Sequence, residues 1–406
     1  MRIVIYHTIL WSKYKGAIFT RLYSLCSSAG VDVSFVQDVS LVQDASLVQD
    51  VSFVQDVSFV QIAETESSYA RLGGVDRSYH HYPFRLLIEG TYNDASVKRR
   101  LWVIGRDLLM HSCDLVVLPG YHLVEHWMML FFCMLLRRRR AVFCDSTSLD
   151  NKKVGVKELA KRFFFSRCDG FFCYGKRTEE YVSSYGVPAS KIYSNCQAAA
   201  LPHGYDPDVV QATYSANAIE MSEEPHFIFI GRLSIEKGLH DLLEAFNLVH
   251  ARIGGARLDL VGAGPLEADL RQHITRLGLD GAITLLGARK LDEVVPLLYR
   301  SVALVLPSYS EPWGLVVNES LSYGCPVVVS DRCGCVPELV IEGVTGYSFT
   351  AGNVDMLSTA MLAAIHLSKD RAVTVKNCLE VMSNFTPEKA AARMLAGCEA
   401  IIEGRS

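Results

Sequence analysis

The sequence predicts an α/β protein with two doubly wound parallel-sheet domains, and three observations support this fold class. The chain has 406 residues, which exceeds what one hydrophobic core usually serves and fits two domains of roughly 150–200 residues. Hydrophobic residues make up 50% of it, so each domain can bury a core. Short apolar runs alternate with helix-length segments along both halves, an alternation typical of parallel strands joined by crossover helices.

Strand-like runs indicate that the first half of the chain is one domain. They begin with RIVIY near the N-terminus, and a helix follows that ends at Gly30. Further runs are VDVSFV, CDLVVLPG, RRAVFCD and GFFCYG, in that order. From Tyr193 to Glu224 the pattern gives way to Ala, Pro, Asn and Ser, which are frequent in loops. We therefore predict an N-terminal domain over 1–205 and a linker over 206–224.

The alternation restarts in the second half and predicts a second domain over 225–385. Its strand-like runs include HFIFIGRL, ARLDLVGAG, AITLLGA, VALVLPS and CPVVVSD, with helix-length segments between them. Since the carboxyl ends of parallel strands share one edge of a sheet, the loops that follow them should gather there. The last segment, PEKAAARMLAGCEAIIEG, has strong helical periodicity. We predict that residues 386–406 form a helix that packs back on the N-terminal domain.

A tandem repeat interrupts the first domain. The six-residue unit DVSFVQ is written five times over residues 32–61, with only Phe/Leu and Val/Ala changes. Its first copy follows the first helix, so we predict that this copy forms the second strand and that four copies were added behind it. The unit has no Gly, Pro or Asn for the turns of a β-helix, which favours a surface loop or extended ribbon. Because six is even, a shift by one unit keeps every side chain on its face, and several copies can compete for one strand position.

Composition argues against several classes of function. The net charge of −4 does not suit a nucleic-acid binder, which would usually carry a basic excess. The twelve cysteines are scattered through apolar surroundings without the spacing of a disulfide framework, so we expect reduced thiols in a cytoplasmic protein. Cys333 and Cys335 lack a second pair at metal-ligand spacing. We therefore expect no metal site.

No segment is expected to cross a membrane, but one region is a candidate for peripheral contact. The most hydrophobic run, WMMLFFCMLL over residues 127–136, is far shorter than the roughly 20 residues that a bilayer requires. It is followed by Arg137, Arg138, Arg139 and Arg140, and KELAKRFFFSRC adds basic and aromatic residues nearby. This pattern suits anionic lipid at the inner face of the plasma membrane. Alternatively, the arginines cap the carboxyl end of a helix that packs on the sheet.

Three motifs in the second half point to one phosphate-binding site. In GRLSIEKG, Arg232 and Lys237 follow a strand, where two fixed cations can neutralise a diphosphate. In SEPWGLVVNES, Glu311 and Glu319 flank a predicted strand-to-helix junction at Gly314. The free amides of a helix start favour an anion, and carboxylates accept strong hydrogen bonds from sugar hydroxyls. In DRCGCVPELVIEGVTGYSF, glycines and a proline mark tight turns near the same sheet edge.

These motifs stand in the order that characterises a known enzyme family. From Phe227 to Phe349 the chain resembles the donor-binding half of family-four retaining glycosyltransferases of the GT-B fold, through GRL…KG, VGAGP, PS…EPWG…E, CPVV and PEL…G…G. The first half matches more loosely, through Gly16 and through PHGYD, which is similar to the family's PNGVD element. The resemblance implies the GT-B architecture, in which two Rossmann-like doubly wound domains face a cleft.

The resemblance also implies roles for individual residues. Arg232 and Lys237 would hold the donor diphosphate and Glu311 would contact the donor sugar, which makes these three the implied catalytic residues. Glu319 would bind the nucleotide ribose. Gly16, expected in a loop, would let that loop approach the donor closely. The implied donor-binding set is Gly16, Gly231, Arg232, Lys237, Glu311, Trp313, Gly314, Leu315 and Glu319, with the backbone of 313–315 meeting the phosphates or the sugar. Catalysis would be electrostatic, so neither a metal nor another cofactor is expected.

The leading hypothesis is a retaining glycosyltransferase that moves a sugar from a UDP- or GDP-linked donor to a glycan or lipid-linked acceptor. The family suggests surface polysaccharide or lipopolysaccharide biosynthesis as its setting. The alternatives are a GT-B epimerase or phosphorylase, and a catalytically silent sugar-nucleotide-binding or scaffold protein. Arg232, Lys237, Glu311 and Glu319 are all present, which a silent relative would have no need to keep. For the acceptor the sequence offers Asp145, which can equally cap a turn.

Overall fold

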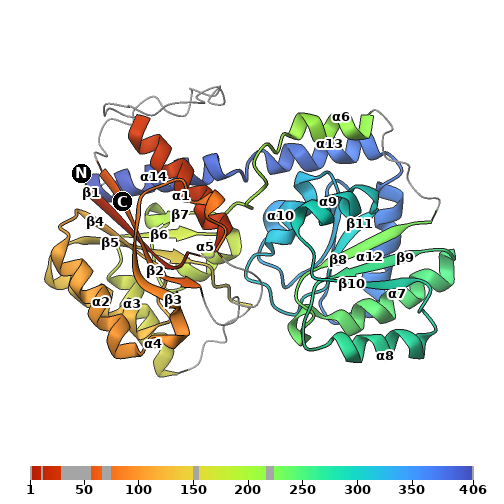
Figure 1. Cartoon of the computed structure of the whole chain (residues 1–406), viewed down its shortest axis with the longest axis horizontal. Coiled ribbons are helices and arrows are strands. Elements are labelled where there is room, and N and C mark those ends of the chain that lie inside the picture. Colours follow the sequence, from red (N-terminus) through yellow and green to blue (C-terminus); the bar gives the residue numbers. More distant parts are fainter. Residues whose placement is uncertain are drawn as a thin grey trace. The chain divides into compact units, whose positions relative to one another are not determined.

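The chain folds into two compact units, each built on its own sheet (Figure 1). The structure is a computed structural model and describes residues 2–10, 12–28, 56–65, 75–149, 155–215 and 224–404. The first unit comprises the described residues of Met1–Ser148, Lys152–Ala200 and Thr386–Ser406, and the second those of Leu149–Asn151 and Leu201–Phe385. Every pair of neighbouring strands in both sheets is parallel. The predicted class, two doubly wound parallel-sheet domains, is confirmed.

The first sheet has seven strands in the order β3-β2-β1-β4-β5-β6-β7. They are β1 (Arg2–Ile9), β2 (Asp56–Thr65), β3 (Phe84–Thr91), β4 (Leu115–Leu118), β5 (Arg139–Cys144), β6 (Gly170–Cys173) and β7 (Ile192–Tyr193). The chain builds outward from β1 in one direction and then resumes at β4 on its other side. In such sheets ligands bind outside the carboxyl ends of the strands at the point where the order reverses.

Helices cover both faces of the first sheet. They are α1 (Lys13–Ser28), α2 (Val97–Met110), α3 (Val124–Leu135), α4 (Val156–Ser166), α5 (Lys176–Ser183) and α14 (Pro387–Glu403). One core cluster joins the sheet to α2, α3, α4 and α5, and another joins it to α1 and α14. The C-terminal helix lies tightly on the sheet, since a Cβ on its Gly397 would come within 2.7 Å of the Phe172 ring.

The strand beside β1 is the fifth copy of the repeat. In β2, Phe59 lies opposite Ile5 of β1 and is 1% exposed, packed against Phe19 and Tyr82 with ring centroids 5.2 and 4.6 Å apart. The first copy, predicted to form this strand, lies outside the described residues. All copies present the same alternation of faces, so the hydrophobic pattern of the repeat could not select one of them.

The second sheet has six strands in the order β10-β9-β8-β11-β12-β13. They are β8 (His226–Ile230), β9 (Arg257–Val261), β10 (Ile283–Gly287), β11 (Ala303–Leu306), β12 (Val327–Ser330) and β13 (Gly346–Phe349). The α-helices of this unit are α6 (Pro207–Ser215), α7 (Leu239–Ile253), α8 (Glu267–Leu277), α9 (Leu291–Arg300), α10 (Leu315–Ser322), α11 (Val336–Leu339), α12 (Val354–Leu367) and α13 (Arg371–Met382). The strand order reverses between β8 and β11.

The predicted linker over 206–224 contains a packed helix. Helix α6 buries Val210 and Tyr214, and the Tyr214 hydroxyl donates to the carbonyl of Tyr323 at 2.9 Å. The Arg371 guanidinium of α13 lies 4.9 Å from the centre of the same ring. The sequence did not predict this helix, because a short helix with only two buried side chains leaves little periodicity in the sequence.

Candidate membrane spans and disulfides are both absent from the residues that the structure describes. Within the described part of the chain, no helix combines the length and the apolar character needed to cross a bilayer. The cysteines described there form no disulfide, and most of them are buried. Burial raises the pKa of several of these thiols, for example that of Cys133 to about 12, which keeps them protonated and unreactive.

Candidate active site

The predicted donor-site residues lie on loops that follow β8 and β11, the two strands between which the second sheet reverses its order. Arg232 stands two residues after the end of β8, and Lys237 ends a short 3-10 helix over Ile235–Lys237. Glu311 follows β11 and Glu319 lies within α10. All of these residues therefore belong to the carboxyl edge of the sheet at its switch point, which is where α/β sheets bind ligands.

Lys237 and Glu311 form an ion pair at this edge. The Lys237 ammonium donates to the Glu311 carboxylate, and each side chain is 18% exposed. The two loops are also joined through their backbones, because the amide of Tyr309 donates to the carbonyl of Glu236 at 2.8 Å. The structure thus places a cation and a carboxylate side by side in positions that the sequence had assigned separately to a diphosphate and to a sugar.

Arg232 complements this pair as an exposed cation on the same loop. Its carbonyl accepts from the amide of Ser234 at 3.0 Å, while the neighbouring Leu233 is fully buried and anchors the loop. The Ser234 hydroxyl donates to the Glu236 carboxylate at 2.5 Å, and this hydrogen bond lowers the pKa of Glu236. The loop is therefore held by its own polar groups, with the Arg232 side chain directed to solvent.

Helix α10 begins at this site without a side-chain cap. Its N-cap is Gly314, at φ +99°, which makes no side-chain cap hydrogen bond. Trp313 is 3% exposed, and its indole donates to Asn318 at 2.8 Å. The Trp313 side chain is thus part of the core. Only the backbone of Trp313 is available to a ligand at the start of α10. Uncapped amides at a helix start carry partial positive charge and favour anions.

The third motif holds the Glu311 segment in place. The amide of Gly334 donates to the Glu311 carbonyl at 2.9 Å, and that of Cys335 donates to the Trp313 carbonyl at 3.0 Å. A Cβ on Gly334 would lie 1.9 Å from the Pro312 carbonyl oxygen, a distance that no side chain can occupy. The turns predicted near the sheet edge therefore clamp the loop that carries Glu311.

The VGAGP turn has a related role beside the Arg232 loop. Gly262 has φ +144°, and a Cβ there would lie 1.8 Å from the carbonyl oxygen of Gly231. The amide of Leu233 donates to the Ala263 carbonyl at 3.0 Å. The turn after β9 is therefore packed against the loop after β8, and its glycine permits this approach.

Gly16 is not in a loop, which corrects the sequence prediction. It lies in the first turn of α1, where its amide donates to the Ser12 carbonyl at 3.0 Å. A Cβ at this position would come within 2.7 Å of the His80 ring and 2.9 Å of the Tyr79 carbonyl. Glycine is a poor helix former, so its presence suggested a loop. In the structure it permits close packing of α1 against residues 79–80.

The carboxyl edge of the first sheet also gathers polar groups, and the predicted Asp145 is one of them. Its carboxylate lies 4.0 Å from Nε2 of His122, and the Ser146 hydroxyl lies 3.4 Å from the same nitrogen. Both His122 and Asp145 are about half exposed. Sequence reasoning missed His122, whose signal was its position after the strand-like run that became β4.

Lys15 is a second residue at that edge which the sequence did not single out. It is 1% exposed, and no hydrogen-bond partner of its ammonium is found among the described residues. The ammonium lies 4.4 Å from the Phe143 ring centre and 4.8 Å from that of Tyr174. Burial lowers the pKa of Lys15 from 10.5 to about 8. The aromatic faces stabilise its charge only in part.

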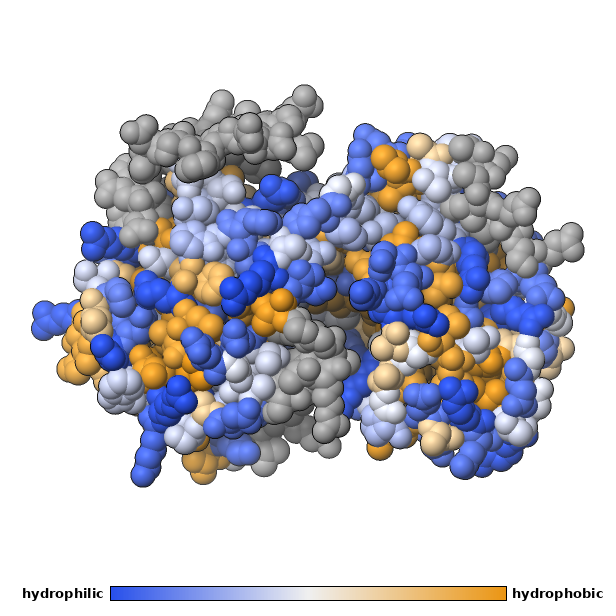
Figure 2. Space-filling model, viewed as in Figure 1, coloured by the Kyte–Doolittle hydropathy of each residue, from blue (hydrophilic) through white to orange (hydrophobic). Residues whose placement is uncertain are grey.

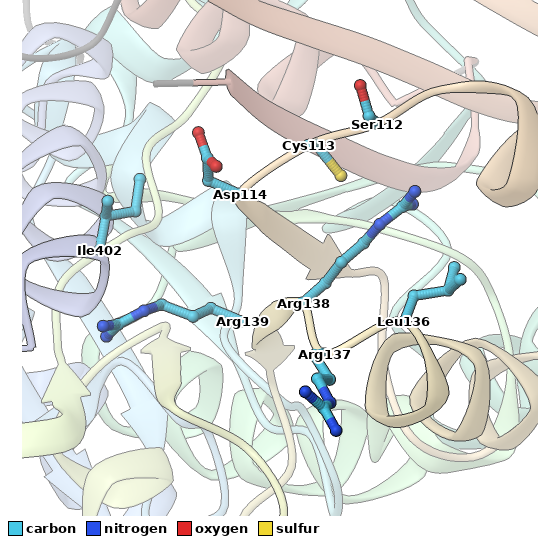
Figure 3. A pocket seen from close by; sticks show the side chains of 8 residues that line it. All are labelled: Ser112, Cys113, Asp114, Leu136, Arg137, Arg138, Arg139 and Ile402. Carbon is cyan, nitrogen blue, oxygen red and sulfur yellow. The ribbon is translucent and has the colours of Figure 1, made fainter.

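The arginine run lies at the opposite, amino edge of the first sheet. Arg137, Arg138 and Arg139 line a cavity of about 520 Å³ beside Cys113 and Ile402, and their side chains point in different directions (Figure 3). The remaining lining residues are Ser112, Asp114 and Leu136. Because ligands of doubly wound sheets bind at the carboxyl edge, this cavity is not the candidate active site.

Three of these arginines are engaged with the protein itself. Arg138 donates to the Leu108 carbonyl at 2.7 Å, and Arg139 donates to the carbonyl of Ile401. Arg140 donates to the carbonyls of Arg138, at 2.9 Å, and of Arg167. The accepting carbonyls lie outside α3, so these side-chain bonds tie the run to other parts of the first unit and are not the helix capping that the sequence offered as the alternative.

Comparison with known proteins agrees with this architecture. Residues 211–380 match the family model described as glycosyl transferases group 1. Sulfoquinovosyl transferase SQD2 of Arabidopsis thaliana is 32% identical over 166 residues, which cover 40% of this chain and 31% of that protein. Glycogen synthase of Mycobacterium tuberculosis is 29% identical over 198 residues, or 45% and 48% of the two chains. The matched part of the chain thus spans 31% and 48% of the lengths of these two curated relatives.

Solved structures match over a larger share of the chain. A lipopolysaccharide outer core galactosyltransferase, WaaB, superposes with a TM-score of 0.69 at 16% identity, covering 100% of both chains. Anabaena HepE in complex with UDP and glucose gives a TM-score of 0.66 at 17% identity, covering 98% of this chain and 99% of that one. At this identity the likeness shows a shared fold, GT-B, in which each domain is Rossmann-like.

Proposed function

We propose that the chain transfers a sugar from a nucleotide-sugar to a hydroxyl of an acceptor, with retention of configuration. The match of residues 211–380 to the glycosyl transferases group 1 model supports this proposal. The observation that carries the proposal is the Lys237–Glu311 ion pair beside the uncapped start of α10. A cation, a carboxylate and a helix start whose N-cap makes no side-chain cap bond lie together at the switch point of the second sheet, a combination that suits a sugar diphosphate.

The proposed chemistry is electrostatic. When the bond between the sugar and the diphosphate breaks, negative charge develops on the leaving phosphate, while the acceptor oxygen forms the new bond to the sugar and its proton passes to an oxygen of that phosphate. Arg232, Lys237 and the first amides of α10 would stabilise that charge, because they are fixed by the fold before the reaction begins. Glu311 would hold hydroxyls of the sugar, and Glu319 those of the ribose. Since these groups can supply the neutralisation, we expect no metal requirement.

The donor is proposed to be UDP- or GDP-linked. Anabaena HepE was solved with UDP, with UDP and glucose, and with UDP-glucose. A Mycobacterium tuberculosis relative, 28% identical over 207 residues, is named as a GDP-mannose-dependent mannosyltransferase. These names support a nucleoside diphosphate as the leaving group, with uracil and guanine as the candidate bases.

The acceptor is proposed to be a glycan or a lipid-linked saccharide. The same mycobacterial relative is named for phosphatidylinositol monomannoside, and the WaaB structure for the lipopolysaccharide outer core. We therefore place the reaction in surface polysaccharide or lipopolysaccharide biosynthesis, in the cytoplasm at the inner face of the plasma membrane. The sequence suggested Arg137–Arg140 for such peripheral contact.

A thermal-shift screen of nucleotide-sugars tests the donor assignment. We expect one family of UDP- or GDP-sugars to raise the unfolding temperature of the wild-type protein, and the Lys237→Ala and Glu311→Ala variants to lose that response. Arg271→Ala is the matched control, since Arg271 pairs with Glu267 at 2.9 Å on the exposed surface of α8 in the same unit. A full response in the two site variants would refute the assignment.

A further inference from the structure

Large apolar side chains are exposed along three helices on one face of the first sheet. Trp102 and Met110 of α2 are 63% and 64% exposed, Leu135 of α3 is 78% exposed, and Leu159 of α4 is 70% exposed. The other exposed apolar side chains of these helices are Val97, Leu109, Val124, Phe131, Val156 and Phe163. We refer to the exposed surface of α2, α3 and α4 as the α2–α4 face.

The α2–α4 face is continuous, because α3 packs between the other two helices. A Cβ on Gly105 of α2 would be in van der Waals contact with Met128 of α3, at 3.8 Å. The rings of Trp127 and Phe163 are nearly parallel, with centroids 6.5 Å apart, so α3 and α4 are in contact as well. In Figure 1 the three helices lie side by side, and Figure 2 shows hydrophobic colour between hydrophilic side chains over the same region.

The charges exposed on this face are positive. Lys98, Arg99 and Arg106 of α2 and Lys157 and Arg162 of α4 are exposed. The sequences of the three helices also contain Asp107, Glu125 and Glu158, none of which is exposed. In a chain with a net charge of −4, this is a local concentration of positive charge.

Each of the three carboxylates is engaged with internal partners. Asp107 accepts from the Tyr6 hydroxyl at 2.6 Å and from Arg85 at 3.0 Å. Glu125 is 1% exposed and accepts from Arg100. Glu158 accepts from the Tyr185 hydroxyl at 2.6 Å. The carboxylates are therefore turned into the unit, and they leave the cations of the α2–α4 face without acidic neighbours on these helices.

Cations and apolar groups are interleaved on this face. The Arg106 guanidinium lies 5.4 Å from the Trp102 ring centre, and that of Arg167, just after α4, lies 5.2 Å from the Phe163 ring centre. An arginine stem beside an exposed ring presents its charge at the level where an apolar side chain would enter the headgroup layer of a bilayer. An exposed apolar patch of this kind marks an interaction surface.

We propose that the α2–α4 face docks the protein peripherally on membranes that contain anionic lipid. Apolar side chains from three helices supply the buried area, and at least five cations supply attraction to a negative surface. Charge complementarity selects an anionic membrane over a neutral one. The proposal is independent of sugar transfer, and it gives the proposed lipid-linked acceptor a surface on which to meet the enzyme.

Flotation of the full chain with extruded vesicles tests this. We expect the wild type to bind vesicles of phosphatidylcholine and phosphatidylglycerol, to bind pure phosphatidylcholine weakly, and to be released when salt is raised from about 0.05 to about 0.5 M. Each cation near a membrane surface contributes about fivefold in partitioning, so the Arg99→Glu, Arg106→Glu double variant should bind at least about 25-fold more weakly. Trp102→Ser combined with Leu135→Ser should also lose binding.

Matched controls come from exposed positions of the second unit. Arg252→Glu with Arg276→Glu, and Leu248→Ser with Val373→Ser, change the same chemistry at exposed sites on α7, α8 and α13, and both should bind like the wild type. No binding by the wild type, equal binding by the face variants, or equal binding to both vesicle types would overturn the proposal. A dimer of the wild type that the face variants dissociate would assign the face to a second copy of the chain and overturn it too. The thermal response of the same variants to nucleotide-sugars is expected to be unchanged. A negative result for membrane binding would therefore leave the proposed sugar transfer standing, and the reverse also holds.

Discussion

The ammonium of Lys237 contacts the carboxylate of Glu311 across 74 positions of the sequence. The pair joins the loops that follow β8 and β11, and it leaves each charged group partly exposed. An anionic ligand that approaches Lys237 must share this ammonium with Glu311. Ligand binding and the geometry of the two loops are therefore linked through one contact.

Replacing Lys237 by Ala should reduce turnover by about 10²–10³-fold, the effect of removing one preorganised group that stabilises developing charge. It should also weaken binding of the nucleoside diphosphate, measured by calorimetry. Lys237→Arg, which keeps the charge, should restore part of the binding. Unchanged turnover in Lys237→Ala, with the Arg271→Ala control equally active, would remove Lys237 from the mechanism.

Replacing Gly334 by Ala should destabilise the second unit. The added methyl group would lie 1.9 Å from the Pro312 carbonyl oxygen, so the segment carrying Glu311 must move, at a cost of about 1–3 kcal/mol or more. Gly281→Ala is the control, since a Cβ there meets nothing within 4 Å. The two unfolding temperatures, measured by differential scanning fluorimetry, should separate clearly. Equal unfolding temperatures would show that the segment carrying Glu311 can accommodate a methyl group at Gly334 without loss of stability.

Lys15 should make a distinct contribution to the pH dependence of stability. Its pKa falls from 10.5 to about 8 on burial, so between these values the unfolded chain binds the extra proton and stability rises with pH. Lys15→Met removes this penalty and should be more stable than the wild type below pH about 8, by about 3 kcal/mol. The difference between the two denaturation midpoints should shrink toward pH about 10.5. A constant difference would contradict the burial of a charged Lys15.

Replacing Phe59 by Ala should cost about 3–5 kcal/mol, because its buried ring packs between Phe19 and Tyr82. Phe53 occupies the equivalent position of the fourth copy, and Phe53→Ala is the matched control. The free energies of unfolding of the two variants, obtained from denaturant titrations, should differ by most of that energy. If both variants were as stable as the wild type, another copy would have taken the place of the fifth in the sheet.

Deletion of residues 32–55 should leave donor binding intact, because β2 is built from Asp56–Thr65 and the proposed donor residues other than Gly16 lie in the second unit. The thermal response to nucleotide-sugars is the measurement. Lost response in a folded deletion variant would give the repeat a role in donor binding that its sequence does not suggest.

Features set by residues close together in the sequence could be predicted, whereas features set by contacts between distant residues could not. Buried parallel strands are continuous apolar runs, so VALVLPS predicted the strand observed as β11. Gly16 was misplaced because the reason for it, the His80 ring, stands 64 positions away in the sequence, whereas its effect on helix propensity is local. The side-by-side placement of Lys237 and Glu311 likewise depends on strand order, which no local pattern contains.

The use of the fifth copy as β2 has a genetic consequence. The first, fourth and fifth copies are all DVSFVQ, so deleting residues 32–55 or residues 38–61 yields the same polypeptide. Because these copies are identical, the strand beside β1 is not encoded by one particular copy. If the array loses or gains a unit before the last copy, the last copy can still pair with β1 in the same register. Replication slippage in steps of eighteen nucleotides can therefore lengthen or shorten this protein while the strand beside β1 keeps its sequence.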